Sequence, residues 1–346
     1  MTGNIAGGLG RFLTAEFGET VAVSNIRQLS VGARRRTIAF DAQRRGHCRR
    51  LVATFVPGPV RRLPVDVEAE TRELARKHGV PVPPIVATCT DPEYVGVPFL
   101  VAELVDGETL PRKVFRLVRA AGIGERLTAQ LGKAMGRLHA IDPHTAPAAL
   151  PTAVEFPEAT THSTPTASPA ADPVRAHLAA VERGVADLPL DRPVLDLALR
   201  WLRDRAPGPP ARKVLLHNDM RTGNLIVDGD GLRAVLDWEE ARRFGDPMRD
   251  VARAALRVWR FGNDRAEFGG FAGREPFRHG YEQVGGVLDI ERFRWWTVLL
   301  TLELGLDLAA EAVAGTGADA RRLAELEWDL LGRIRPESRG PQRVCS

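Results

Sequence analysis

Three cysteines among 346 residues are too few and too scattered for a disulfide framework. Cys48, Cys89 and Cys345 stand in unrelated contexts, and no two of them have the spacing of a metal site. We therefore expect free thiols and a reducing, cytoplasmic location, because disulfide-rich domains belong to oxidising compartments.

Long apolar stretches are also missing. No segment reaches the roughly 20 apolar residues of a membrane-spanning helix, and residues 1–18 lack the basic start and apolar run of a signal peptide. The sequence thus predicts a soluble protein without a membrane partner. With 346 residues, of which 44% are hydrophobic, the chain is long enough for two lobes and a well-buried core.

Lysine is scarce, since only four of the 48 basic residues are lysines and the others are arginines. The net charge is +4 and the sequence pI is about 9.3, values that invite a nucleic-acid interpretation. The arginines are spread along the chain, however, and no aromatic platforms alternate with them. We therefore expect a solvated basic surface and no nucleic-acid partner.

The most informative segment is residues 214–250, VLLHNDMRTGNLIVDGDGLRAVLDWEEARRFGDPMRD. Two apolar runs in it are separated by two Asp-Gly pairs, which supply the positive φ of a tight turn, so the segment predicts a β-hairpin. Asn224 precedes the first strand and Asp237 follows the second. The hairpin should bring these two side chains to the same end, with Asp219 on the loop that leads in.

Two carboxylates and one amide oxygen at strand ends form a site suited to Mg²⁺, which binds through few protein ligands and through substrate phosphates. One carboxylate then stays available as a base. The spacing of His217, Asp219, Asn224 and Asp237 resembles the catalytic loop and the metal-binding aspartate of kinase-like phosphotransferases.

The closer resemblance is to the aminoglycoside phosphotransferase family. The phrases HNDMRTGNLIV, LDWEEA and GDPMRDVA follow its pattern, in which Asp-Trp-Glu replaces the Asp-Phe-Gly of protein kinases. The resemblance implies that Asp219 orients or deprotonates an acceptor hydroxyl, and that Asn224 and Asp237 hold Mg²⁺ on the nucleotide phosphates. Residues expected to surround and brace these groups are His217, Arg221, Glu239, Asp246 and Asp250.

The resemblance also implies a two-lobed α+β fold of the protein-kinase type, with a small β-rich amino-terminal lobe and a larger helical carboxy-terminal lobe. We expect residues 1–101 in the first lobe, 102–335 in the second and 336–346 in a flexible tail. Nucleotide would bind between the lobes. The hinge that pairs with the purine through its backbone would be Ala102, Glu103, Leu104 and Val105.

The strand expected at 49–56 departs from the family pattern, because Thr54 stands where the family has a lysine or arginine for the α- and β-phosphates. Two replacements are open. Arg50 shares a strand face with Thr54, since side chains alternate along a strand, and the arginines at 34–36 could reach over from the neighbouring strands. Glu70, on the next helix, stands at the position of the family's ion-pairing glutamate. Without a substitute arginine, phosphate binding would be weak.

Residues 142–172 are rich in Pro, Thr, Ser and Ala, a composition that buries little apolar surface. We expect a long mobile loop, either part of an acceptor lid or a disordered insertion. The tryptophans of the closing helices should be mostly core, with one or two in the acceptor pocket; these are Trp259, Trp295, Trp296 and Trp328.

The function implied by the resemblance is Mg²⁺-dependent transfer of the γ-phosphoryl group of ATP or GTP to a hydroxyl group of a small molecule. Positioning and charge neutralisation would supply most of the catalysis. Aminoglycosides are polycations that require an acidic pocket, which a basic chain favours less. Hydroxyacyl thioesters are anionic and suit the arginine excess.

Two further alternatives stay open. One is an enzyme that phosphorylates Ser or Thr of a peptide natural-product precursor. The other belongs to a different class, a catalytically inactive nucleotide-binding or scaffold protein, and is motivated by Thr54. The presence of Asp219, Asn224 and Asp237 argues against inactivity.

Overall fold

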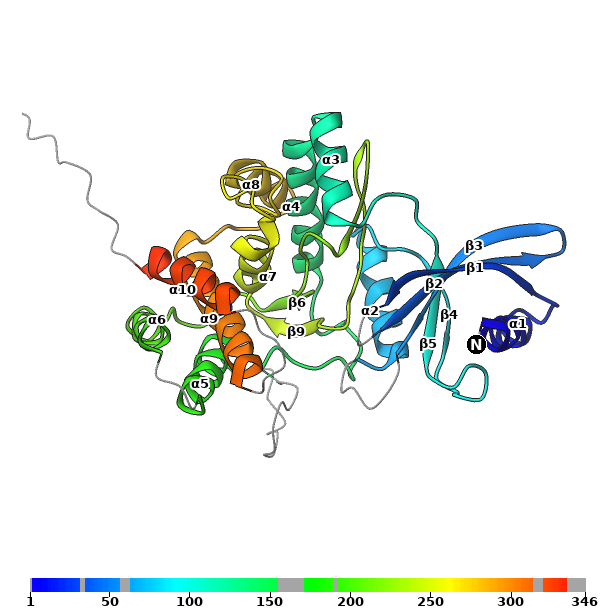
Figure 1. The fold of residues 1–346 in the computed structure, drawn as a ribbon, viewed down its shortest axis with the longest axis horizontal. Helices are drawn as coiled ribbons and strands as arrows, with labels where there is room; N and C mark the ends of the chain where they lie inside the picture. Colours follow the sequence, from blue (N-terminus) through cyan, green and yellow to red (C-terminus); the bar gives the residue numbers. More distant parts are fainter. Residues whose placement is uncertain are drawn as a thin grey trace, which may run out of the picture.

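Five antiparallel strands form the amino-terminal lobe in the order β1-β2-β3-β5-β4 (Figure 1). The computed structural model describes residues 2–31, 35–56, 63–154, 171–188, 192–313 and 320–334. The strands are β1 (Ala22–Val31), β2 (Arg36–Arg44), β3 (His47–Phe55), β4 (Ile85–Cys89) and β5 (Phe99–Glu103). On β3 the buried residues alternate with half-buried ones, so each face of the sheet has its own partner.

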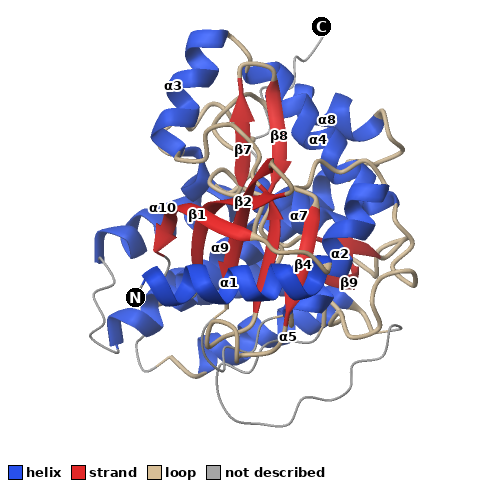
Figure 2. Cartoon of the chain, turned by 90° about the vertical axis from the view of Figure 1, so that its right-hand side faces the viewer, coloured by secondary structure: helices blue, strands red, loops and turns tan. Residues whose placement is uncertain are grey.

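One helix covers each face of this sheet. Helix α1 (Thr2–Phe17) lies across the outer face (Figure 2), and its Leu9 and Leu13 are buried in the cluster that contains Leu51 of the sheet. Each such side chain contributes about 1.5–3 kcal/mol through burial. Helix α2 (Val65–Lys77) lies on the other side of the sheet, between it and the helical lobe (Figure 1).

The carboxy-terminal lobe is mainly helical and contains two small antiparallel sheets. Its helices are α3 (Pro111–Ala121), α4 (Gly124–Ala140), α5 (Pro173–Ala186), α6 (Pro193–Asp204), α7 (Pro247–Ala254), the 3-10 helix η1 (Arg257–Arg260), α8 (Arg274–Glu282), α9 (Ile290–Val313) and α10 (Ala320–Ile334). Strand β6 (Val214–Leu216) pairs with β9 (Arg242–Gly245), and β7 (Leu225–Asp228) pairs with β8 (Gly231–Val235).

Glycines allow α4 and α8 to approach closely. A Cβ atom at Gly280 of α8 would lie 1.9 Å from the carbonyl oxygen of Ala129, and one at Gly132 of α4 would lie 2.2 Å from that of Phe277. Any larger residue would push the two backbones apart. Helix α4 thus packs directly on α8, and it also contacts β6, the strand that precedes the predicted catalytic loop.

The predicted two-lobed α+β fold is confirmed by this architecture. Strand β5 extends to Glu103, two residues beyond the expected lobe boundary at 101, and helix α3 was not among the predicted elements. After β9, helix α7 is followed by the short η1. Most of the Pro-rich loop and the tail fall on 155–170 and 335–346, outside the described residues.

Several predictions about single side chains can be compared with the structure. Trp295 and Trp296 are buried, as expected, whereas Trp328 is 68% exposed because it lies on the solvent side of α10. Cys48 and Cys89 are free thiols; Cys345 lies outside the described residues. None of the helices in the described ranges is long and apolar enough to cross a membrane.

Candidate active site

The predicted hairpin is present and brings Asn224 and Asp237 together. In its register Leu225 pairs with Val235, and the N–H of Leu236 donates to the carbonyl oxygen of Asn224 at 2.8 Å. Asp237 has a left-handed backbone with φ of 63°, a conformation that costs a non-glycine residue about 1–3 kcal/mol unless its surroundings enforce it. The residue after the hairpin is therefore held in a defined orientation.

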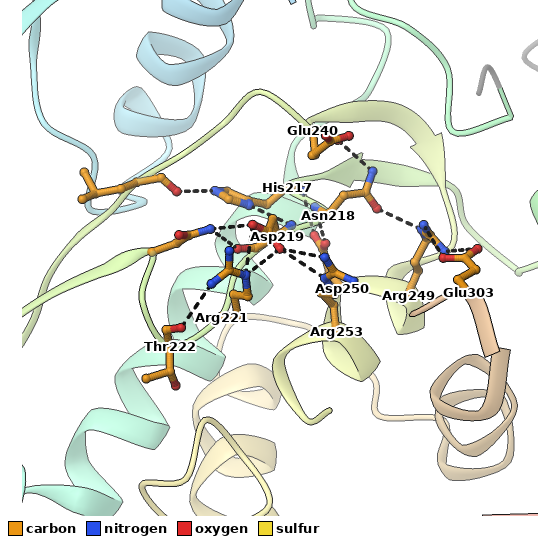
Figure 3. Close-up of polar contacts among 12 residues, drawn as sticks. His217, Asn218, Asp219, Arg221, Thr222, Glu240, Arg249, Asp250, Arg253 and Glu303 are labelled. Atoms are coloured by element: carbon orange, nitrogen blue, oxygen red, sulfur yellow. Dashed lines mark hydrogen bonds and ion pairs between the residues drawn. The ribbon is translucent and has the colours of Figure 1, made fainter. Parts of the chain in front are cut away.

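The carboxylate of Asp219 lies at the centre of the site and is surrounded by donors (Figure 3). Its Oδ2 accepts a hydrogen bond from Asn224 Nδ2 at 2.7 Å. Its Oδ1 lies 3.0 Å from both Arg221 Nε and Arg253 Nη2. The side chain is buried, and these contacts fix its orientation. The structure thus brings three of the predicted site residues, Asp219, Asn224 and Arg221, into direct contact.

Asp250 braces the loop that carries Asp219. One carboxylate oxygen accepts the N–H of His217 at 2.8 Å, and the other accepts the N–H of Asn218 at 2.6 Å. Burial alone would raise the pKa of Asp250, but the hydrogen bonds from the His139 side chain and from the backbone N–H of His217 lower it. The buried aspartate is therefore ionised and fixes two consecutive amides of the catalytic loop.

His217 also contacts the backbone of the loop. Its Nδ1 accepts the N–H of Asp219 at 3.1 Å, and its Nε2 donates to the carbonyl oxygen of Leu236 at 3.1 Å. This pair of bonds needs a neutral imidazole with one donor and one acceptor nitrogen. Burial lowers the pKa of His217 and so favours that neutral form. The ring joins the catalytic loop to the end of the hairpin.

Asp246 begins helix α7 and is completely buried. It caps the helix by accepting the N–H of Met248 at 3.0 Å, with Pro247 in the first turn. Its other carboxylate oxygen lies 2.7 Å from Nη1 of Arg292. The cap fixes the start of the helix that carries both Asp250 and Arg253.

Arg35 connects the amino-terminal lobe to this site. Its Nη2 lies 2.7 Å from Oε2 of the buried Glu68 on α2, and its Nε lies 2.5 Å from Oε2 of Glu239. Its Nη1 lies 4.0 Å from Oδ1 of Asp237. Burial lowers the pKa of Arg35, but the charge of Glu68 and its hydrogen bond more than compensate. The structure thus places one member of the 34–36 triplet beside the expected metal ligand.

Two predicted nucleotide-binding side chains lie elsewhere. Glu70 is exposed, because two residues correspond to about 200° of rotation around a helix, and α2 presents Glu68 to the site instead. Arg50 is 52% exposed and forms an ion pair with Asp106. It lies at the hinge end of β3, where its carbonyl oxygen accepts the N–H of Leu104.

Arg35 lies at the opposite end of the sheet from Arg50, close to Thr54. Thr54 on β3 pairs with Thr37 on β2, two residues after Arg35. Arg35 directly precedes β2 and shares a sheet face with Thr37 and its partner Thr54, because side chains alternate along a strand. Arg34 of the same triplet lies outside the described residues.

The predicted hinge begins within β5, whose last two residues are Ala102 and Glu103. The N–H of Glu103 donates to the carbonyl oxygen of Pro84 at 2.9 Å, and the N–H of Leu104 donates to that of Arg50 at 3.0 Å. These two N–H groups are therefore already used in hydrogen bonds within the protein. Recognition of a base by this segment would have to use other backbone groups, such as the N–H of Val105.

The carboxylate of Asp237 is suited to hold a divalent cation. Burial raises the pKa of Asp237, Arg35 opposes this effect and the nearby Asp219 adds to it, so a bound cation would stabilise the ionised carboxylate. The amide nitrogen of Asn224 faces Asp219, which directs its amide oxygen elsewhere. The described residues include no group of three or more His, Cys, Asp or Glu arranged for a metal ion. Mg²⁺ does not require three such protein ligands, because phosphates and water complete its coordination.

Two residues of this site, Glu68 and Arg253, were not predicted. Arg253 follows Asp250 by three residues on α7, and residues at this spacing share a helix face. Since Asp250 was expected beside the catalytic loop, the spacing could have indicated Arg253 as well. Nothing in the local sequence distinguishes Glu68 from Glu70.

Comparison with known proteins places this geometry in a family. The model of the phosphotransferase enzyme family matches residues 25–296, which is most of the chain. Comparison with curated proteins gave no significant match.

Solved structures share the fold. A thermostable variant of the aminoglycoside phosphotransferase APH(4)-Ia, in complex with AMP-PNP and hygromycin B, is 20% identical with a TM-score of 0.62, over 95% of this chain and 98% of that one. A candidate aminoglycoside phosphotransferase from Ralstonia eutropha is 18% identical with a TM-score of 0.63, over 95% and 98%.

A macrolide 2'-phosphotransferase from Brachybacterium faecium is 17% identical with a TM-score of 0.54, over 94% of this chain and 96% of that one. At these identities the solved structures establish the fold, and the family model covers the catalytic loop, the hairpin and helix α7. The chain therefore belongs to the phosphotransferase enzyme family and is an enzyme of phosphoryl transfer to a hydroxyl group.

Proposed function

We propose that this enzyme transfers the γ-phosphoryl group of a Mg²⁺-bound nucleoside triphosphate, ATP or GTP, to a hydroxyl group of a small molecule. The observation that carries the proposal is the convergence of Asp219, Asn224 and Asp237 at one end of the hairpin, next to Arg35. These groups supply the three requirements of phosphoryl transfer: a hydroxyl-orienting carboxylate, metal ligands and a cation for the phosphates.

Each residue has a role that follows from its contacts. Asp219 would accept the hydrogen bond of the acceptor hydroxyl and hold its oxygen for attack. Asn224 and Asp237 would hold Mg²⁺, which neutralises phosphate charge when bound. His217 and Asp250 keep the loop in place through backbone contacts. The carboxylate that orients the nucleophile is thus held by residues that do not themselves react.

Thr54 stands at the position where the family has a lysine or arginine. Arg35 would contact the nucleotide phosphates in its place. Its side chain is held by Glu68 on one side and Glu239 on the other. An arginine fixed between two carboxylates is pre-oriented for a third anion. This placement supports a catalytically competent enzyme over the inactive alternative.

The bound ligands of a structural relative support the same reaction class. APH(4)-Ia has been crystallised with AMP-PNP and hygromycin B together, so this fold accommodates a nucleotide and a small-molecule acceptor at once. Val105 and the neighbouring backbone would receive the purine. A cytoplasmic location, without a membrane or nucleic-acid partner, stays our prediction.

The decisive experiment measures Mg²⁺-nucleotide binding by calorimetry and slow nucleotide hydrolysis for three proteins: wild type, Asp219→Asn and Asp264→Asn. Asp264 is an acid of the same lobe that pairs with Arg257 on the exposed surface. We expect Asp219→Asn to lose about 10²- to 10⁴-fold in turnover while nucleotide affinity is nearly unchanged, and Asp264→Asn to match wild type. Retention of more than about a tenth of the turnover would contradict the role of Asp219. Absence of Mg²⁺-nucleotide binding in wild type would contradict the proposed reaction.

A further inference from the structure

We propose that Arg253, with Arg221 and Trp259, forms an anion-binding subsite beside Asp219, and that the acceptor is a hydroxyl compound carrying a carboxylate or phosphate group. The inference rests on the proposed function, because it assigns the substrate class of that site. It starts from the way the three side chains are arranged around a single carboxylate oxygen.

The two oxygens of Asp219 share the Nε of Arg221, at 3.0 and 3.1 Å, and otherwise face different neighbours. Oδ2 accepts from Asn224, which lies on the side of the expected metal ligands. Oδ1 accepts from Nε and Nη2 of Arg253 at 3.1 and 3.0 Å. Figure 3 shows the contacts of Arg253 reaching Asp219 from helix α7. If metal and nucleotide occupy the Asn224 side, the acceptor must approach from the side of Arg253.

Positive charge exceeds negative charge on that side. Arg221 and Arg253 both pair with Asp219, and no other ion pair of either arginine is found within the described ranges. Their side chains are 23% and 22% exposed. Two guanidinium groups facing one carboxylate leave a net charge that a second anion would balance.

Trp259 forms an apolar support for both cations. The guanidinium carbon of Arg221 lies 4.1 Å from the centroid of its ring, and that of Arg253 lies 5.5 Å away. Stacking on an aromatic face keeps a guanidinium in place without using its hydrogen-bond donors. The ring therefore pre-orients the two guanidinium groups beside Asp219.

Oδ1 of Asp219 is fully used by its arginine contacts. It accepts from Arg221 Nε as well as from both nitrogens of Arg253. A hydroxyl that donates to the same oxygen must displace one of these donors, and an anionic group on the acceptor would satisfy the displaced guanidinium. A polycationic acceptor would instead face two like charges. The arrangement selects anionic acceptors and disfavours aminoglycosides.

The test is a set of titrations of the full chain at constant ionic strength with Mg²⁺ and AMP-PNP present. The probes all carry a hydroxyl group: glycerol 3-phosphate, 3-hydroxybutyrate, its neutral methyl ester and the cationic hygromycin B. Calorimetry reports binding, and the two anions distinguish a phosphate ester from a carboxylate. We expect at least one anion to bind saturably and at least about tenfold more tightly than the ester or hygromycin B. Neither of these two probes carries an anionic group that could form charge-assisted contacts with the arginines.

The variants are Arg253→Gln, Arg253→Lys and the control Arg257→Gln. Arg257 lies on η1 and pairs with Asp264 at the exposed surface, away from Asp219. We expect Arg253→Gln to weaken anion binding at least about tenfold, Arg253→Lys to have an intermediate effect and Arg257→Gln to have none. Thermal unfolding shows whether each variant is folded, and Arg253→Lys keeps the test valid if the glutamine variant is not.

Four outcomes separate the possibilities. Selective anion binding that depends on Arg253 supports the inference. Absence of anion binding, or equal binding in wild type and Arg253→Gln, overturns it. If Arg253→Gln weakens AMP-PNP binding and leaves anion binding unchanged, Arg253 serves the nucleotide and the inference is wrong while the proposed function stands. If anions bind through Arg253 but Mg²⁺-AMP-PNP does not bind wild type, the anion subsite stands and the proposed reaction is wrong.

Discussion

Arg35 and Glu68 form a two-contact ion pair, with Nη1 donating to Oε1 at 3.3 Å and Nη2 donating to Oε2 at 2.7 Å. Glu68 is 1% exposed and Arg35 is 13% exposed, so solvent screens the pair little. The same arginine contacts Glu239 of the carboxy-terminal lobe. One side chain thus joins the sheet lobe, helix α2 and the segment after the hairpin, at the place where the family resemblance predicts a strand lysine.

The first prediction concerns this arginine. Arg35→Ala should weaken Mg²⁺-nucleotide binding by about ten- to a hundredfold, because a charge-assisted phosphate contact is worth about 1.5–3 kcal/mol. Arg50→Ala is the matched control and should have little effect, since Arg50 pairs with Asp106 at the exposed hinge. Calorimetric titration of both variants checks this. A larger loss in Arg50→Ala would show that Arg50 binds the phosphates after all.

The second prediction is that Asp237→Asn raises the stability of the protein and removes its Mg²⁺-dependent nucleotide binding. Burial raises the pKa of Asp237 above the ordinary value of 3.8, so the native state binds this proton more tightly than the unfolded chain does. The free energy of unfolding therefore falls as the pH rises from that value through the raised native pKa, because the side chain becomes ionised in the folded protein. The variant should be more stable near neutral pH, by less than about 1 kcal/mol because the side chain is partly exposed, and should lose Mg²⁺-dependent nucleotide binding.

Thermal unfolding at about pH 7 and about pH 4 checks the sign, since the gain should be larger at the higher pH. Calorimetry with and without a chelator checks the metal. A variant less stable than wild type near neutral pH would refute the electrostatic argument, and unchanged metal dependence would show that Asp237 is not a ligand.

The third prediction is that Asp250→Ala destabilises the protein by about 3–5 kcal/mol. The substitution removes a buried charge and leaves the N–H groups of His217 and Asn218 without their acceptor. Asp264→Ala, which breaks an exposed pair with Arg257, should cost at most about 1 kcal/mol. Urea unfolding compares the two. A similar decrease in the free energy of unfolding in both variants would contradict the bracing role of Asp250.

The fourth prediction tests the contact between α4 and α8. Gly280→Ala should destabilise by about 1–3 kcal/mol, because its Cβ would lie 1.9 Å from the carbonyl oxygen of Ala129 and the helices would have to separate. In Gly332→Ala no atom lies within 4 Å of the added Cβ on α10, and the substitution should stabilise by about 0.5–1 kcal/mol. Urea unfolding measures both. Stabilisation by Gly280→Ala would show that the helices can separate at little cost.

The centre of the site could be predicted because it is local in sequence. The loop and hairpin from His217 to Asp237 are set by Asp-Gly turn chemistry and strand alternation. The register pairs Leu225 with Val235, so Asn224 and Asp237 end side by side. The helix cap at Asp246 follows in the same way from its position before Pro247. Interactions within a few residues leave few alternatives for such groups.

By itself, therefore, the sequence determined the identity and spacing of the candidate catalytic and metal-binding residues, while the tertiary structure decided which distant residues support them. The side of α2 that faces the site depends on how the helix docks against the sheet, and this selects Glu68 over Glu70. The pairing of β2 with β3 places Arg35 beside Thr54, whereas the bond between Arg50 and Leu104 keeps Arg50 at the hinge. The contact of Arg253 with Asp219 joins residues 34 positions apart. Such contacts result from the packing of whole elements, because docking angle and register are set by the burial of many side chains at once and not by any local pattern.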